Sequence, residues 1–180
     1  AVVDIEEERA AGTVELIKQA GGEAISVITD VTDENQVKRM VELVENEWGP
    51  ISVLVNNVAI SDHDGLFDLS VETFDRVFAV NVRGAFLCTR EVAKSMKRGG
   101  GGRIVNVSST SAHRSRTDAP AYAASKAAIV NFSRSMARIL APEIRVNTLS
   151  PTRTGSPVGE GEERSGEVVD AILVGRWGKP

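Results

Sequence analysis

Cysteine is almost absent from this chain of 180 residues, and its absence excludes one class of stabilising bond. Cys88 is the only cysteine, so no internal disulfide bond can form. It lies in an apolar stretch with helical spacing, where we expect it to pack in the core and not to act as a nucleophile. A chain without disulfides suits a reducing compartment, and we therefore expect a cytoplasmic protein.

Other missing features exclude further classes of function. No apolar run approaches the length of a membrane span. The two histidines, His63 and His113, are too isolated to predict a metal site. A net charge of −4 and a pI near 5.3 argue against a nucleic-acid surface. With 42% hydrophobic and 26% charged residues, the composition is that of an ordinary soluble globular protein, and we expect one domain over residues 1–180.

A glycine-rich phosphate-binding turn is missing as well. No G-x-x-x-G-x-G pattern occurs anywhere in the chain. The four glycines from Gly99 to Gly102 follow an expected helix, whereas a dinucleotide-binding turn follows a strand. We interpret this run as a flexible connector. The chain opens on AVVDI with no methionine, no basic region and no cleavage signal, as if it began inside a strand.

What the chain does contain is an alternation of two patterns. Short apolar, β-branched runs predict strands at residues 1–5, 24–29, 51–55, 103–107 and 144–149. Apolar residues three and four apart predict helices at residues 6–20, 33–47, 71–97, from Pro120 to about Leu140 and, weakly, at 167–174. Strands that alternate with helices predict an α/β fold with a parallel sheet.

Polar residues stand where these expected strands end. Asp4, Asp30, Asn56, Ser109 and Ser150 each fall at or just beyond the end of a strand. In open parallel sheets, ligands bind beyond the carboxyl ends of the strands. The sequence therefore predicts a ligand site along this edge.

Tyr122 and Lys126 indicate that proton transfer could take place at this edge. Residues four apart lie on one face of a helix, so the phenol and the ammonium group can face the same pocket. Pro120 suits the first turn of that helix. A phenol titrates near pH 10, and a nearby cation stabilises phenolate, so such a tyrosine can exchange a proton with an alcohol near neutral pH. Tyr-x-x-x-Lys is nevertheless short and also occurs by chance.

Together these motifs make the sequence resemble the classical short-chain dehydrogenase/reductase family, along essentially its whole length. The family's catalytic residues correspond to Asn81 in AVNVRGAF, Ser109 in IVNVSS, and Tyr122 and Lys126 in YAASK. The resemblance implies a Rossmann-like, doubly wound sheet. It implies that Tyr122 is the general acid/base and Lys126 its cationic partner, which also holds the nicotinamide ribose. Ser109 would donate a hydrogen bond to the substrate oxygen, and Asn81 would kink its helix and hold a water.

The resemblance also implies the residues that hold the cofactor. Asp4 would bind the adenosine ribose, and its carboxylate favours NAD over NADP because it repels a 2′-phosphate. Asp30 and Val31 would contact the adenine, and Asn56 would lie below the cofactor. Tyr122 and Lys126 complete the set, together with three residues of the PTRTGS segment: Pro151, Thr154 and Ser156.

Departures from the family pattern are of two kinds. Asn-Asn-Ala-Gly is Asn56-Asn57-Val58-Ala59 here, and Thr152 and Ala112 replace usual glycines. More important, the resemblance implies that the first strand, its glycine-rich turn and the last strand are missing. In the sheet order 3-2-1-4-5-6 that first strand is central, so we expect two unpaired strand edges. We interpret the chain as partial and expect it to bind NAD weakly on its own, which isothermal titration would test.

The function that follows is an oxidoreductase that transfers hydride between NAD(H) and a secondary alcohol or ketone, in a homodimer or homotetramer. Two alternatives remain open: a non-catalytic binding or assembly module, and a sugar-nucleotide epimerase or dehydratase, which the Asn56 and Asn81 segments argue against. The substrate is not readable. His113, Arg114 and Arg116 could meet an anionic substrate, but a solvated loop is the simpler interpretation.

Overall fold

The computed structural model describes residues 1–152, and all statements about structure below concern those residues. The chain forms parallel strands separated by helices, as the alternating pattern predicts. The strands are β1 (Val2–Asp4), β2 (Ser26–Ile28), β3 (Val53–Asn56), β4 (Gly102–Val107) and β5 (Ile144–Leu149). The helices are α1 (Glu7–Gln19), α2 (Glu34–Trp48), α3 (Val71–Phe78), α4 (Ala85–Arg98) and α5 (Pro120–Ile139), with two shorter segments, η1 (Ala79–Gly84) and η2 (Thr110–Ala112). The expected helix at 167–174 lies outside the described residues.

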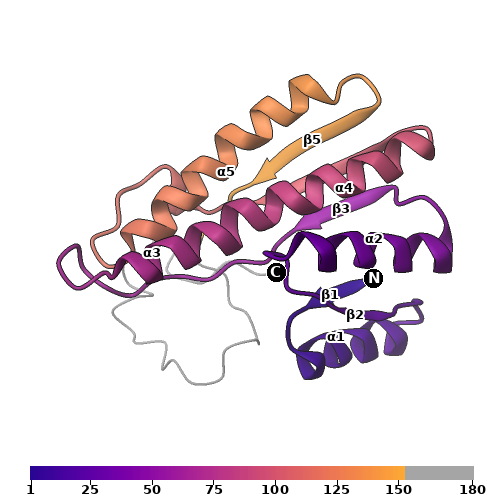
Figure 1. Ribbon diagram of the computed structural model, residues 1–180, viewed down its shortest axis with the longest axis horizontal. Coiled ribbons are helices and arrows are strands. Elements are labelled where there is room, and N and C mark those ends of the chain that lie inside the picture. Colours follow the sequence, from indigo (N-terminus) through magenta and orange to yellow (C-terminus); the bar gives the residue numbers. More distant parts are fainter. Residues whose placement is uncertain (153–180) are drawn as a thin grey trace.

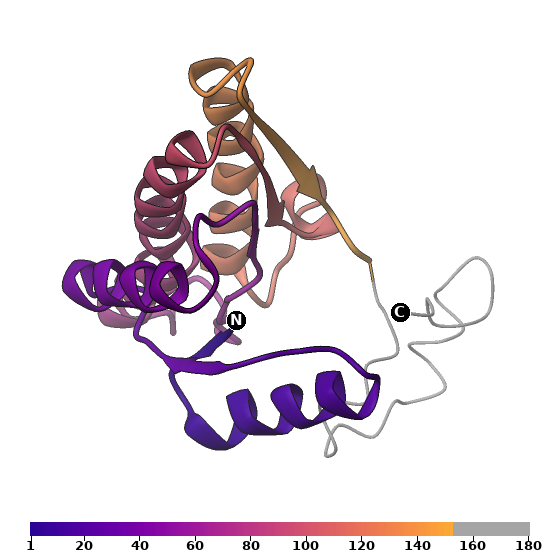
Figure 2. The ribbon, with the colours of Figure 1, turned by 90° about the vertical axis from the view of Figure 1, so that its right-hand side faces the viewer.

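The strands form two separate parallel sheets. One has the order β1-β2 and the other the order β3-β4-β5. Within the described chain, β1 and β3 each pair with one neighbour only, so the expectation of two unpaired edges is confirmed for these residues. Figure 2 shows the β1-β2 unit with α1 below the other described helices and strands. The arrowheads of β3 and β5 in Figure 1 point to the same side, as parallel strands require.

Helix α2 begins where the sequence predicts, and its cap explains why. The Asp33 carboxylate accepts hydrogen bonds from the N–H groups of Asn35 and Gln36, at 2.8 and 3.0 Å. The Gln36 side chain accepts from the N–H of Asp30, at 2.9 Å, and so ties the helix to the end of β2. The apolar stripe of α2 is buried, and it includes Val37, Met40 and Val41.

The core lies where α2, α4 and the β3-β4-β5 sheet meet. Met96 of α4 and Ile104 of β4 are fully buried, and Cys88 is also buried, as expected for a packing residue. Helices α4 and α5 both pack on the three-stranded sheet, and Figure 1 shows them running side by side. Burial of these apolar side chains, at about 25 cal/mol per Å², is the main favourable term for this fold.

The expected helix at 71–97 is not a regular α-helix throughout. A π-helical segment, η1, separates α3 from α4. A π-helical segment accommodates an extra residue within the helix, which rotates the side chains that follow. Asn81 and Gly84 are the buried residues of η1, and a Cβ on Gly84 would lie 2.8 Å from a methyl group of Val31. Periodicity predicted one uninterrupted helix because it does not register this local widening.

No helix in the part of the chain that the structure describes is both long and apolar enough to cross a bilayer.

Candidate active site

Helix α5 carries Tyr122 and Lys126, and a carboxylate from another segment caps its first turn. Pro120 occupies the first helical turn, as predicted. The two carboxylate oxygens of Asp62 accept hydrogen bonds from the N–H groups of Ala121, at 3.0 Å, and Tyr122, at 2.8 Å. Asp62 lies in the loop between β3 and α3, and only 2% of its surface is exposed. A distant carboxylate therefore caps the helix that bears the predicted acid/base.

Tyr122 and Lys126 lie together, as the four-residue spacing predicts. The Lys126 Nζ atom is 5.6 Å from the centroid of the Tyr122 ring. Lys126 is 3% exposed, whereas Tyr122 is half-buried. At this distance a cation is attracted to the face of an aromatic ring, and the attraction is stronger where water is excluded. The two side chains therefore share one environment.

The buried position of Lys126 changes its protonation. Its Nζ atom donates a hydrogen bond to the Val107 carbonyl at the end of β4, at 2.8 Å. Burial disfavours the charged form and lowers the pKa of Lys126 to about 8. At pH 7 the ammonium form still dominates by about ten to one. Lys126 can therefore act as a cation at neutral pH.

The Asn81 side chain forms three hydrogen bonds to protein atoms, on two sides. Its Oδ1 accepts from the Ile60 N–H at 2.9 Å, and its Nδ2 donates to the Ile60 carbonyl at 2.9 Å. Nδ2 also donates to Ser125 Oγ, at 2.9 Å, on the helix of Tyr122. The π-helical segment around Asn81 agrees with the expected irregularity of this helix. The water that Asn81 would hold stays a prediction.

The two serines after β4 have different tasks. Ser109 Oγ accepts from the Ser111 N–H at 3.1 Å and so caps η2, which packs against α5. Its hydroxyl hydrogen has no acceptor within residues 1–152. Ser108 is buried, and its hydroxyl donates to the Lys126 carbonyl at 2.8 Å. The cap after β4 is therefore Ser109, whereas the Ser108 side chain is directed toward α5.

Asn56 belongs to a buried polar ladder beneath the site. Its Nδ2 donates to Asn106 Oδ1, at 2.7 Å, and to Thr89 Oγ1, at 3.0 Å. Asn106 in turn donates to Ser133 Oγ, at 2.8 Å, and is completely buried. The side chain of Asn56 is therefore directed into the protein, and its expected contact with a cofactor stays a prediction.

The carboxylates at the ends of β1 and β2 are more accessible and bond locally. Asp4 accepts from the N–H of Glu6 at 2.9 Å. Asp30 accepts from the N–H and the hydroxyl of Thr32, both at 2.8 Å. Both carboxylates are half-buried. Arg9, which could have contacted a 2′-phosphate, forms an ion pair with Glu6 at 2.9 Å.

The loop before α5 and the segment after β5 complete the surroundings. The Arg116 guanidinium is bonded to Asp118 and holds the pKa of that carboxyl down to about 2. Arg114 and His113 are exposed, which agrees with a solvated loop. The Pro151 carbonyl accepts from the Thr110 N–H at 3.0 Å, close to Ser109. Thr154 and Ser156 lie outside the described residues, and within residues 1–152 no cluster of metal-ligating side chains occurs.

Three residues at this site were not predicted from the sequence, namely Asp62, Ser108 and Asn106. Asp62 is one of several acidic residues in the stretch SDHDGLFDLS, and nothing in that pattern marks it as the buried one. Asn106 interrupts an apolar strand, and that interruption was a usable signal because a polar residue inside a buried strand needs a partner.

Comparison with known proteins identifies the family. The sequence profile of the short chain dehydrogenase family matches residues 1–165. An uncharacterised oxidoreductase of Thermotoga maritima is 38% identical over 151 residues, which are 83% of this chain and 59% of that protein. The chloroplastic NADPH-dependent aldehyde reductase 2 of Arabidopsis thaliana is 43% identical over 131 residues, which are 71% of this chain and 48% of that protein. The chain thus spans only about half to three fifths of the length of these relatives.

Solved structures agree with the profile. The crystal structure of NAD+-bound xylitol dehydrogenase superimposes with a TM-score of 0.89 at 27% identity, over 98% of this chain and 76% of that one. The structure of actinorhodin polyketide ketoreductase with NADPH gives a TM-score of 0.92 at 28% identity, over 99% and 74%. The predicted Rossmann-like α/β fold is therefore confirmed, and this chain belongs to the short chain dehydrogenase family.

Proposed function

We propose that this chain is the catalytic part of an NAD(H)-dependent oxidoreductase that interconverts a secondary alcohol and a ketone. The observation that carries the proposal is the placement of the Lys126 ammonium group 5.6 Å from the centre of the Tyr122 ring, at the end of β4. Lys126 thereby supplies a positive charge beside the Tyr122 ring. Tyr122 then takes the hydroxyl proton from an alcohol, or gives it back to the oxygen of a ketone.

The other predicted catalytic residues support this proton transfer. Ser109 would direct its free hydroxyl hydrogen to the substrate oxygen, where negative charge develops during reduction. Asn81 would keep α5 in register through its bond to Ser125. Lys126 would also bind the ribose hydroxyls, because its ammonium has three donors and only one hydrogen bond in the described chain.

The residues present fit a nicotinamide dinucleotide at the strand ends. When bound, that cofactor accepts or supplies the hydride. Asp4 and Asp30 are half-buried carboxylates without a cationic partner at hydrogen-bonding distance among the described residues, so both have acceptor capacity for ribose hydroxyls or an adenine amino group. Because Arg9 is paired with Glu6, it does not neutralise Asp4, and this favours NAD over NADP. The relatives' names include both NAD+ and NADPH.

The decisive experiment replaces the only tyrosine of the chain. In the full-length protein that includes these residues, Tyr122→Phe should lower turnover by about 10²- to 10⁴-fold while the circular dichroism spectrum stays unchanged. No other phenol in this chain can substitute for it. Substrates would come from a screen of ketones and acyl thioesters with NADH. Undiminished turnover in Tyr122→Phe would contradict the proposal.

Cofactor choice has its own test. Asp4→Asn removes the negative charge but keeps the size of the side chain. If Asp4 repels a 2′-phosphate, the substitution should favour NADP. The ratio of kcat/KM for NAD to kcat/KM for NADP should then fall by about tenfold. Glu8→Gln is a matched control, because Glu8 is exposed on α1 and makes no side-chain hydrogen bond or ion pair among the described residues. An equal ratio in wild type and Asp4→Asn would refute this part of the proposal.

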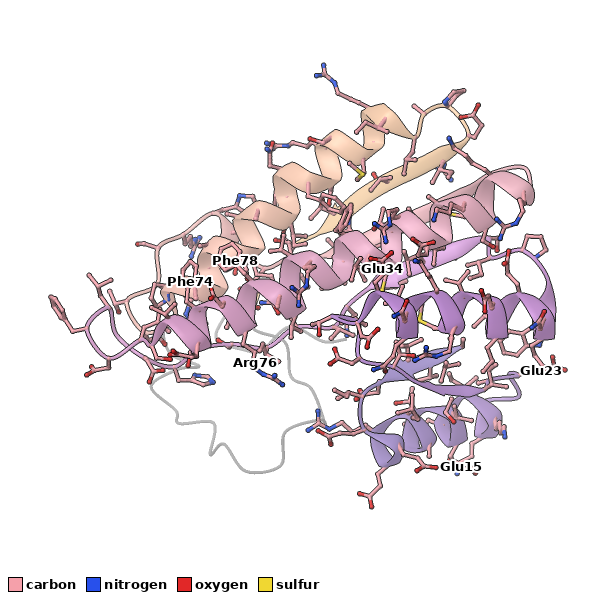
Figure 3. The ribbon with its side chains drawn as sticks, viewed as in Figure 1. Glu15, Glu23, Glu34, Phe74, Arg76 and Phe78 are labelled. Atoms are coloured by element: carbon pink, nitrogen blue, oxygen red, sulfur yellow. The ribbon has the colours of Figure 1, made fainter. Side chains whose placement is uncertain are left out.

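Self-association through the long helical segment α3-η1-α4 and through α5 is also proposed. Phe86 on α4 is 41% exposed, with Arg90 lying 5.2 Å over its ring. Phe74 on α3 is equally exposed, and its ring stacks on that of Phe78 with 4.8 Å between the ring centroids. Figure 3 labels both residues. Large exposed aromatic side chains are typical of contact surfaces. Sedimentation equilibrium of wild type and Phe86→Ser would test whether a dimer or tetramer depends on this face.

A further inference from the structure

We propose that Asp62 is a positioning residue for Tyr122, because its buried carboxylate holds the first turn of α5 in place. Asp62 touches neither Lys126 nor Ser109 through any hydrogen bond. Its effect on the reaction passes through the backbone of Tyr122. The catalytic consequence therefore rests on the proposed function, whereas the structural consequence does not.

The backbone N–H groups at the start of α5 show why the helix needs Asp62. The ladder of helical hydrogen bonds begins at the N–H of Ala123. Before that residue, Pro120 has no N–H to offer, and the N–H groups of Ala121 and Tyr122 have no acceptor within the helix. Each of these two groups donates to a different oxygen of Asp62, at 3.0 and 2.8 Å. A single carboxylate thus satisfies both free donors.

This cap comes from a segment far from α5 in the sequence. The residue before the helix, Ala119, has no side chain that could cap it. Asp62 acts from 59 and 60 residues away. A local cap moves with its helix, but a cap on another segment fixes the helix relative to that segment. The positive end of the helix dipole favours the carboxylate in return, although the side chain is only 2% exposed.

The loop that carries Asp62 is itself held in place. Asn81 bonds both the N–H and the carbonyl of Ile60, two residues before Asp62. Asn81 also donates to Ser125 Oγ, and Ser125 donates to the Tyr122 carbonyl at 2.7 Å. The N–H of Tyr122 is thus fixed through Asp62, and its carbonyl through Ser125. Both routes lead to Asn81, and together they form a closed circuit around the backbone of Tyr122.

This circuit explains how a half-buried tyrosine can have a defined position. The first turn of a helix frays most readily, and Tyr122 is in that turn. Without Asp62, the turn would open and the phenol would sample positions away from Lys126. Because the substrate and cofactor contacts of other residues would persist, we expect kcat to fall by about tenfold or more with little change in KM.

The experiment compares two substitutions of Asp62 with a matched control elsewhere. Asp62→Ala removes both acceptors, and Asp62→Asn keeps the volume and one acceptor oxygen. The control is Asp33→Ala, because the Asp33 carboxylate also accepts hydrogen bonds from two first-turn N–H groups, those of α2, although through a single oxygen. Amide hydrogen exchange at Ala121 and Tyr122 and the ring resonances of Tyr122 are measured by NMR in each variant.

Exchange at Ala121 and Tyr122 should be about tenfold faster, or more, in Asp62→Ala, and intermediate in Asp62→Asn. The tyrosine ring resonances should shift in the same order. Asp33→Ala should speed exchange at Asn35 and Gln36 and leave the tyrosine resonances unchanged. If Asp62→Ala does not fold, Asp62→Asn alone decides. Unchanged exchange at both α5 amides, or an equal tyrosine shift in Asp33→Ala, would overturn the inference.

Measurements of turnover distinguish a failure of this inference from a failure of the proposed function. If Tyr122→Phe keeps its activity, the proposed function fails, but the exchange results still decide whether Asp62 holds the turn. If Tyr122→Phe is inactive while Asp62→Ala and Asp62→Asn retain the wild-type kcat, the proposed function stands and the positioning role is wrong. A lowered kcat in Asp62→Ala that Asp62→Asn partly restores, at constant KM, supports the inference.

Discussion

Polar side chains form local hydrogen bonds in one sheet of this molecule and long-range hydrogen bonds in the other. Among residues 1–152, the carboxylates of Asp4 and Asp30 in the β1-β2 unit bond only to residues two positions further along the chain. In the β3-β4-β5 unit, polar side chains bond across long separations, as between Asn56 and Asn106 or Asn81 and Ser125. Figure 3 shows Glu15 and Glu23 on the outside of the first unit.

This difference corresponds to different tasks. Carboxylates that are to receive ribose hydroxyls must keep free acceptor capacity, so they are half-buried and only locally bonded. Side chains that are to transfer a proton must be held to within a fraction of an ångström, and a misplacement of about 1 Å is costly. A buried polar network supplies that rigidity, since each unsatisfied member would destabilise the fold. The comparison predicts large effects of substitution in the second unit and small effects in the first.

The largest effect on stability is expected at Asn106. Asn106→Ala removes the bonds to Asn56 and Ser133 from a site with no exposed surface. Lost hydrogen bonds, an Asn56 amide hydrogen left without this acceptor and a small cavity together should lower the free energy of unfolding by about 3 kcal/mol. Urea denaturation measures this change. Asn131→Ala on the exposed face of α5 is the control and should change stability by less than about 0.5 kcal/mol.

A smaller, pH-dependent effect is expected at Lys126. Burial lowers its pKa to about 8, while in the unfolded chain it stays near 10.5. Between these values the unfolded state binds more protons, so the stability of the wild type should rise with pH relative to Lys126→Met. From pH 7 to pH 10 the relative gain should be about 2 kcal/mol. Lys97→Met at an exposed site is the control. A constant difference between wild type and Lys126→Met would show that Lys126 is not desolvated.

The smallest effect is expected in the first unit, at Asp4. Asp4→Ala removes one hydrogen bond to an exposed N–H, which water can replace. We expect thermal unfolding to report a loss of about 0.5 kcal/mol. A loss as large as that in Asn106→Ala would mean that the two units are not built differently, and the comparison would fail.

Much of the fold followed from local patterns. Strand β5 matches its predicted range, 144–149, because an apolar β-branched run between Pro142 and Ser150 has few alternatives. Helix α2 begins within one residue of its predicted start, because the side chain of Asp33 caps it locally. The boundaries of β2 and β3 differ from prediction by one to two residues at each end, because strand ends depend on pairing with a neighbour.

The candidate site was predictable in part, for the same reason. Tyr122 and Lys126 share a helix, so their proximity follows from helix geometry alone. The different tasks of Ser108 and Ser109 were not predictable, because adjacent strand residues point to opposite faces and the sequence does not say which face meets α5. Asp62 acts across 60 residues, and no local pattern encodes such a pairing.

The amino-acid sequence by itself determined the order of elements, the helix that carries Tyr122 and Lys126, and the acidic ends of β1 and β2, because each depends on residues close together in the chain. The tertiary structure alone decided which polar side chains are buried and what satisfies them. The partners of Asn81, Asn106 and Asp62 come from segments far apart in sequence. Buried polar groups must find partners wherever the fold brings them, and only the folded chain specifies where that is.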